Sequence, residues 1–135
     1  MKITKVIREF MEETLSAKRL EANNKARADY DARRKACIEE IEALRESMRE
    51  PVENILRKYD MDMEYGSYNP NPMFDEIWYM RDASIQNQNE LTAIRKKEQE
   101  RMETQKTAMR DIELEMALGG DKAKFMEMLE QVVIE

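Results

Sequence analysis

The 135-residue sequence contains no histidine, one cysteine, three glycines and three prolines. Without histidine the chain cannot build a Ser-His-Asp triad, a Cys-His nucleophile or a histidine metal site, and it lacks an imidazole for acid–base chemistry near neutral pH. A single cysteine excludes an intramolecular disulfide and a zinc site of the Cys-x-x-Cys type. We therefore expect a protein that is not an enzyme and that carries no cofactor or metal.

Long hydrophobic runs are also missing. No apolar run approaches the roughly 18 residues that a membrane-spanning helix needs. The first residues, Met1 to Ile7, are too interrupted by charge for a secretory signal. These features predict a cytoplasmic protein without a membrane partner, in which Cys37 is a buried, reduced thiol on the apolar face of a helix.

The residues that are abundant form helices. Charged residues make up 39% of the chain and there are 12 methionines, a composition typical of long helices rather than sheets. Apolar residues recur at intervals of three and four from Ile3 to Met48, and the same spacing resumes after Pro51. This pattern predicts a helix over about 2–62 with a kink near Pro51, because proline lacks the amide hydrogen and clashes with the preceding turn.

The remaining elements follow from turn and capping signals. The glycine and prolines clustered around Gly66 predict a turn over 63–71. A second long helix is expected over about 72–118, ended by Gly119-Gly120. Asp121 is a candidate N-cap for a short third helix over about 121–133.

Two long helices joined by one turn predict an all-α fold. The expected architecture is a single helical domain, 1–135, built as a long antiparallel helical hairpin of coiled-coil type, with the short third helix packed at its open end. At that end, four residues should contact Ile112, Met116 and the third helix: Ile3, Val6, Ile7 and Phe10. At the turn end, Val52, Ile55, Leu56 and Tyr59 should meet Phe74, Ile77 and Trp78. A pairing between two chains would preserve the same periodicities.

Between these ends the predicted helix interface is poor in apolar side chains. Alanines of the first helix should face Ser84, Asn87, Glu98 and Gln105 of the second. Because alanine buries little area, such a two-helix shaft is marginally stable. We therefore expect self-association through the shaft, or strain between two better-packed ends.

The charge distribution predicts a basic belt. The net charge is −6, but a hairpin brings segment 18–35, with a charge of +4, beside segment 95–110, with +3. The belt comprises Lys18, Arg19, Lys25, Arg27, Arg33, Arg34, Lys35, Arg95, Lys96, Lys97 and Arg101. Since Tyr30 is its one aromatic residue and the chain is acidic overall, direct nucleic-acid binding is the less favoured use of this belt.

The predicted turn end is acidic and rich in tyrosine, the residue type that often anchors protein interfaces. The candidate partner-binding residues are Asp60, Asp62, Glu64, Tyr65, Tyr68 and Tyr79. The alternating carboxylates do not match a calcium loop, because position twelve is Asn71 instead of glutamate. A charged surface of this kind can set register with a partner and penalise wrong alignments.

Three functions fit these features. The first is a non-enzymatic α-helical protein–protein interaction module that self-associates or docks on a larger protein. The second is a small acidic inhibitor, of the kind that mobile elements or phages use against host defences, which covers a basic, nucleic-acid-handling surface of its target. The third is a coiled-coil scaffold or spacer in a larger assembly.

Overall fold

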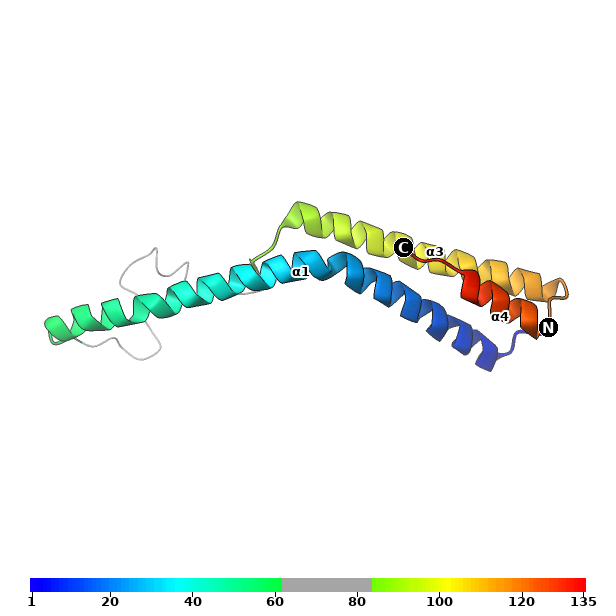
Figure 1. Cartoon of the computed structure of the whole chain (residues 1–135), viewed down its shortest axis with the longest axis horizontal. Helices are drawn as coiled ribbons and strands as arrows, with labels where there is room; N and C mark the ends of the chain where they lie inside the picture. The colour runs from blue at the N-terminus through cyan, green and yellow to red at the C-terminus, as the bar shows by residue number, and fades with distance from the viewer. Residues whose placement is uncertain (62–83) are drawn as a thin grey trace. The chain divides into compact units, whose positions relative to one another are not determined.

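The computed structural model describes residues 1–61 and 84–135. In these ranges α1 spans Lys5–Lys58, α3 spans Gln88–Ala117 and α4 spans Lys122–Gln131 (Figure 1). No strand occurs among the described residues, which confirms the all-α prediction. The turn predicted over 63–71 lies outside them. None of the helices in these two ranges has the length and apolar character needed to cross a membrane.

The chain divides into two compact units. Unit 1 combines Met1–Ala28 with Gln88–Glu135, and unit 2 is Asp29–Asn87. Helix α1 therefore contributes its first part to unit 1 and its remainder to unit 2. Pro51 lies inside α1 without ending it.

Both ends of α1 differ slightly from the predicted 2–62. At its start, the Thr4 hydroxyl accepts a 3.3 Å hydrogen bond from the amide of Ile7, as an N-cap does. At its end, Asp60 adopts a φ of 54° and the amide of Met61 donates to the carbonyl of Leu56 at 2.8 Å. This is a left-handed C-terminal cap, which is tolerated by aspartate more readily than by most non-glycine residues.

The helix predicted over about 72–118 is not continuous, because α3 begins at Gln88. Residues 72–83 of that prediction lie outside the described residues. Residues 85–87 are not helical. Their backbone is held by unit 2 contacts instead: Arg34 Nε donates to the Ile85 carbonyl at 3.0 Å, and the Asn87 amide donates to Tyr30 Oη at 3.3 Å. Asparagine and serine compete with helical hydrogen bonds, so the polar run before Gln88 is a weak helix former.

The boundary between α3 and α4 agrees with the capping signals. Gly119 has a φ of 109°, where a side chain would be strained. A Cβ on Gly120 would lie 2.5 Å from Met116 Cε and 3.2 Å from the Glu115 carbonyl oxygen, so a larger residue there would require the Met116 side chain to shift. The Asp121 side chain then accepts a 2.8 Å hydrogen bond from the amide of Lys124, which confirms the predicted N-cap of α4.

The core of unit 1 forms where α1, α3 and α4 meet (Figure 1). Its buried members are Met11, Leu15, Ile112, Met116, Phe125, Leu129 and Ile134. Ile3 and Ile7 pack against this cluster as predicted. Val6 and Phe10 do not join the buried core, since they are 73% and 46% exposed. Apolar spacing alone marked a stripe wider than the face that the other two helices cover.

Helices α1 and α3 run antiparallel within unit 1. Arg8 near the start of α1 pairs with Glu113 near the end of α3 at 2.9 Å, and Arg27 pairs with Glu98 at 2.8 Å. Residue numbers therefore rise along one helix as they fall along the other. The hairpin therefore forms within one chain and brings parts of segments 18–35 and 95–110 together, as the predicted basic belt requires.

Candidate functional site

A row of polar side chains crosses the α1–α3 interface of unit 1. Arg19 Nε donates to Gln105 Oε1 at 2.7 Å, and Gln105 Nε2 donates to Ser16 Oγ at 3.0 Å. One helical turn further along, Arg101 Nη1 donates to Asn23 Oδ1 at 3.0 Å. Together with the Arg27–Glu98 ion pair, these residues form what we call the polar ladder. Its members take up much of the interface between the two helices.

The polar ladder corrects the sequence-based expectation for this stretch. Glu98 and Gln105 do face α1, but arginine and serine side chains meet them where alanines were expected. Asn23, Arg101 and Gln105 are buried. A buried polar group left without a partner costs about 1–3 kcal/mol, so each of these contacts makes correct alignment of the two helices more favourable than a shifted one.

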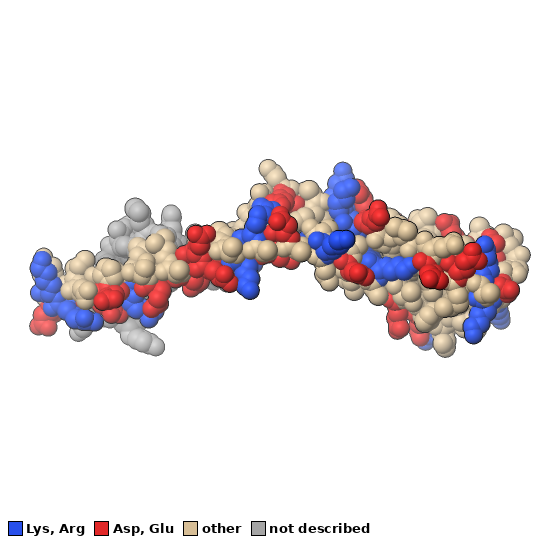
Figure 2. Space-filling model, in the orientation of Figure 1, with Lys and Arg blue, Asp and Glu red and all other residues tan. Residues whose placement is uncertain are grey.

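The basic belt is partly used inside unit 1. Arg19, Arg27 and Arg101 are the belt residues that contact the facing helix, and Lys25 is exposed. Arg95, Lys96 and Lys97 are exposed on α3, where Lys97 pairs with Glu100 at 3.5 Å. On the face drawn in Figure 2, basic and acidic side chains are interspersed. Partner binding by the belt stays a prediction.

Lys18 has a structural role that the sequence did not indicate. Its ammonium group donates to the carbonyls of Leu129, Glu130 and Val132 at 3.0, 3.0 and 2.8 Å. These carbonyls lie at the C-terminal end of α4, where a helix leaves its last acceptors unpaired and carries a partial negative charge. Lys18 thus fastens the end of α4 to α1.

The remaining belt residues belong to unit 2. Arg33 pairs with Asp29 at 3.1 Å and lies 6.0 Å from the centre of the Tyr30 ring. Arg34 holds the Ile85 carbonyl, and Lys35 pairs with Glu39 at 3.9 Å on an exposed surface. These contacts stabilise the first turns of α1 in unit 2 and the backbone beside them.

The structure overturns one sequence prediction about unit 2. Cys37 is exposed, so the expected buried thiol is wrong. Cys37 lies four residues before Ile41, so its side chain is at the edge of the apolar face and not at its centre. Asp60 lies in the left-handed cap of α1 described above. The other candidate partner-binding residues, Asp62, Glu64, Tyr65, Tyr68 and Tyr79, lie outside the described residues.

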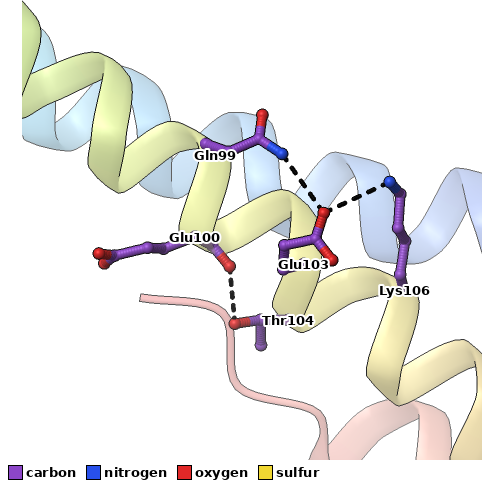
Figure 3. Close-up of polar contacts among 5 residues, drawn as sticks. All are labelled: Gln99, Glu100, Glu103, Thr104 and Lys106. Atoms are coloured by element: carbon purple, nitrogen blue, oxygen red, sulfur yellow. Dashed lines mark hydrogen bonds and ion pairs between the residues drawn. The ribbon is translucent and has the colours of Figure 1, made fainter.

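The outer face of α3 is stabilised within the helix. Glu103 accepts a 3.3 Å hydrogen bond from Gln99 and a 3.4 Å contact from Lys106, while the Thr104 hydroxyl donates to the Glu100 carbonyl at 3.0 Å (Figure 3). Exposed pairs of this spacing each contribute only about 0.2–0.5 kcal/mol. They support helix formation without assembling a reactive group.

The part of α1 in unit 2 presents a different surface. Between residues 31 and 61 no described residue is buried, but every third or fourth one is partly buried. This heptad face consists of Arg34, Ile38, Ile41, Arg45, Met48, Val52 and Leu56. Leu44, Ile55 and Tyr59 beside it are 50%, 60% and 63% exposed. The partners predicted for its C-terminal residues, Phe74, Ile77 and Trp78, lie outside the described residues.

The heptad face has the spacing of a coiled-coil seam, in which apolar residues alternate at intervals of three and four. Arg45 is the one charged residue in its middle, and it pairs with Glu42 at 2.6 Å while its side chain is 17% exposed. Its aliphatic stem can therefore pack on the face while its charge is balanced. Comparison of the chain with family models, curated proteins and solved structures finds no match.

Proposed function

We propose that the chain is a non-enzymatic α-helical protein–protein interaction module that self-associates through the heptad face of α1. The observation that carries this proposal is the row of residues from Ile38 to Leu56 at three- and four-residue spacing, all apolar except Arg45, in a stretch with no buried described residue. In water, apolar surface at this spacing gains free energy when a second helix covers it, at about 25 cal/mol per Å².

A second copy of the chain suits this face in an antiparallel arrangement. If Arg45 lies opposite Met48 of the second copy, Ile41 lies opposite Val52 and Ile38 lies opposite Ile55. The same register places Glu42 beside Arg49 of the second copy, on both sides of the two-fold axis. Arg49 is available for this, because its own pair with Glu46 is exposed and 3.6 Å long. Self-complementarity of this kind is what a two-fold symmetric interface requires.

The test is the mass of the full chain in solution as a function of concentration. We expect light scattering on a sizing column to show a rise from 16.1 kDa toward twice that mass over about 10 µM to 1 mM. Ile41→Glu and Val52→Glu should remain at the mass of one chain, because each places a charge opposite an apolar residue of the second copy.

Ala43→Glu provides the matched control. Ala43 is exposed on the opposite side of α1, so the same added charge should leave assembly unchanged. A wild-type chain that stays at 16.1 kDa throughout this range would show that the proposal is wrong. Equal assembly of Ile41→Glu and wild type would show that another surface mediates it.

A further inference from the structure

A groove runs between α1 and the C-terminal residues within unit 1. Ala22 and Ala26 of α1 form one wall, residues 132–135 form the other, and Arg101 of α3 reaches the lining between them. The groove has a volume of about 670 Å³, within the range of small-molecule sites. Half of the ten lining residues are apolar, namely Ala22, Ala26, Val132, Val133 and Ile134, and the other half are charged, namely Lys18, Glu21, Lys25, Arg101 and Glu135.

The side chain of Arg101 makes this groove unusual. The residue is 8% exposed, and its Nε atom is buried without a hydrogen-bond partner. Its one hydrogen bond in the described part of the chain runs from Nη1 to the neutral amide oxygen of Asn23. No carboxylate of the described residues forms an ion pair with it. A buried guanidinium in this condition is costly, since its charge has lost water without gaining a counter-ion.

The charges around the groove favour a singly charged anion. Lys25 is exposed at the rim and forms no ion pair with any described residue, while Glu21 and Glu135 also line the groove. The two carboxylates oppose a doubly charged ligand. A planar carboxylate matches the donor geometry of guanidinium, and apolar walls favour a ligand with an apolar body.

We infer that this groove binds a small organic carboxylate with an apolar body. The carboxylate lies on the guanidinium of Arg101, near Lys25, and the apolar body lies between the alanines of α1 and the C-terminal residues. This inference concerns unit 1 and is independent of self-association through the heptad face.

Calorimetric titration of the full chain with octanoate at low salt tests the inference. We expect one site with a dissociation constant below about 1 mM, and binding at least about tenfold weaker for acetate, 1-octanol and inorganic phosphate. Acetate lacks the apolar body and octanol lacks the charge. Phosphate lacks both the apolar body and the planar carboxylate group. Phosphate binding as tight as octanoate would overturn the proposed ligand class.

Arg101→Met should reduce octanoate binding at least about tenfold, because it keeps the aliphatic stem and removes the guanidinium. The variant removes an uncompensated buried charge but also leaves Asn23 Oδ1 without its donor, so its melting temperature without octanoate is measured to establish that it folds. Arg95→Met, an exposed site on the same helix, is the matched control and should bind octanoate as wild type does.

Ala22→Leu is a second test, because it fills the groove and leaves the guanidinium of Arg101 unchanged. It should also abolish binding, so the inference remains testable if Arg101→Met fails to fold. Absence of octanoate binding to wild type at about 5 mM would show that the inference is wrong. The inference would also be wrong if Arg101→Met and Ala22→Leu both bound octanoate as tightly as wild type does.

Discussion

Individual polar residues decide how α1 and α3 align in unit 1. Ser16 and Asn23 lie seven residues apart on α1, and Glu98 and Gln105 have the same separation on α3. They occupy heptad positions where a coiled coil ordinarily places apolar side chains, as Ile112 does seven residues after Gln105. A shift of either helix by one turn would leave buried polar atoms unpaired. The polar ladder therefore stabilises the interface less than apolar side chains would, but it favours one alignment of the two helices over shifted ones.

Lys18 gives a residue-level prediction. Lys18→Met should lower the free energy of unfolding of unit 1 by about 1–3 kcal/mol, because the three carbonyls at the end of α4 lose a charged donor. Urea denaturation followed by circular dichroism measures the change. Lys25→Met, which removes an exposed lysine of the same helix, should change stability by less than about 0.5 kcal/mol. Equal stability of the two variants would show that the Lys18 contacts contribute nothing.

At the scale of helices, apolar spacing and capping residues were sufficient to predict most elements. The stripes along both long helices, the glycines after Ala117 and the Asp121 cap all appear in the structure. Spacing could not tell which flank of a stripe α4 covers, so Val6 and Phe10 were wrongly placed in the core. It also could not reveal that Lys18 would reach carbonyls more than 110 positions away.

The candidate sites were harder to predict than the helices. Belt residues such as Arg19 and Arg101 carry the same charge as exposed ones, and charge alone does not reveal which side chains point into an interface. The heptad spacing that continues through Asn23 and Gln105 was the available signal. Polar residues at such positions predict buried hydrogen bonds once a facing helix is known.

The proposed antiparallel pairing of α1 yields a prediction about charge. Arg49→Glu should weaken self-association, because it places two acidic side chains together on each side of the interface. Adding Glu42→Arg to that variant should restore assembly, since the pair is then reversed. A parallel arrangement would not bring these two positions together and would show no rescue. Concentration-dependent light scattering of the wild type, Arg49→Glu and the double variant distinguishes the two outcomes.

Among the described residues, burial is concentrated in unit 1. The fully buried side chains of the described residues are Met11, Leu15, Ile112 and Met116, all within that unit. The buried apolar residue of unit 2, among those described, is Tyr30, which is 7% exposed. Since cooperative stability follows buried apolar contact, the two parts of α1 should differ in how often their hydrogen bonds open, although they belong to one continuous helix.

Hydrogen exchange on the intact chain measures this difference. At about 5 µM, amides of residues 38–58 should exchange at least about tenfold faster than those of residues 9–27, because little buried surface opposes local opening in the later part of α1. At about 200 µM the difference in exchange rate between the two ranges should become smaller in wild type, since association protects the heptad face. It should not become smaller in Ile41→Glu. Uniform protection along α1 at the lower concentration would contradict this prediction. It would mean that the heptad face is already covered within the single chain, which would remove the driving force for self-association.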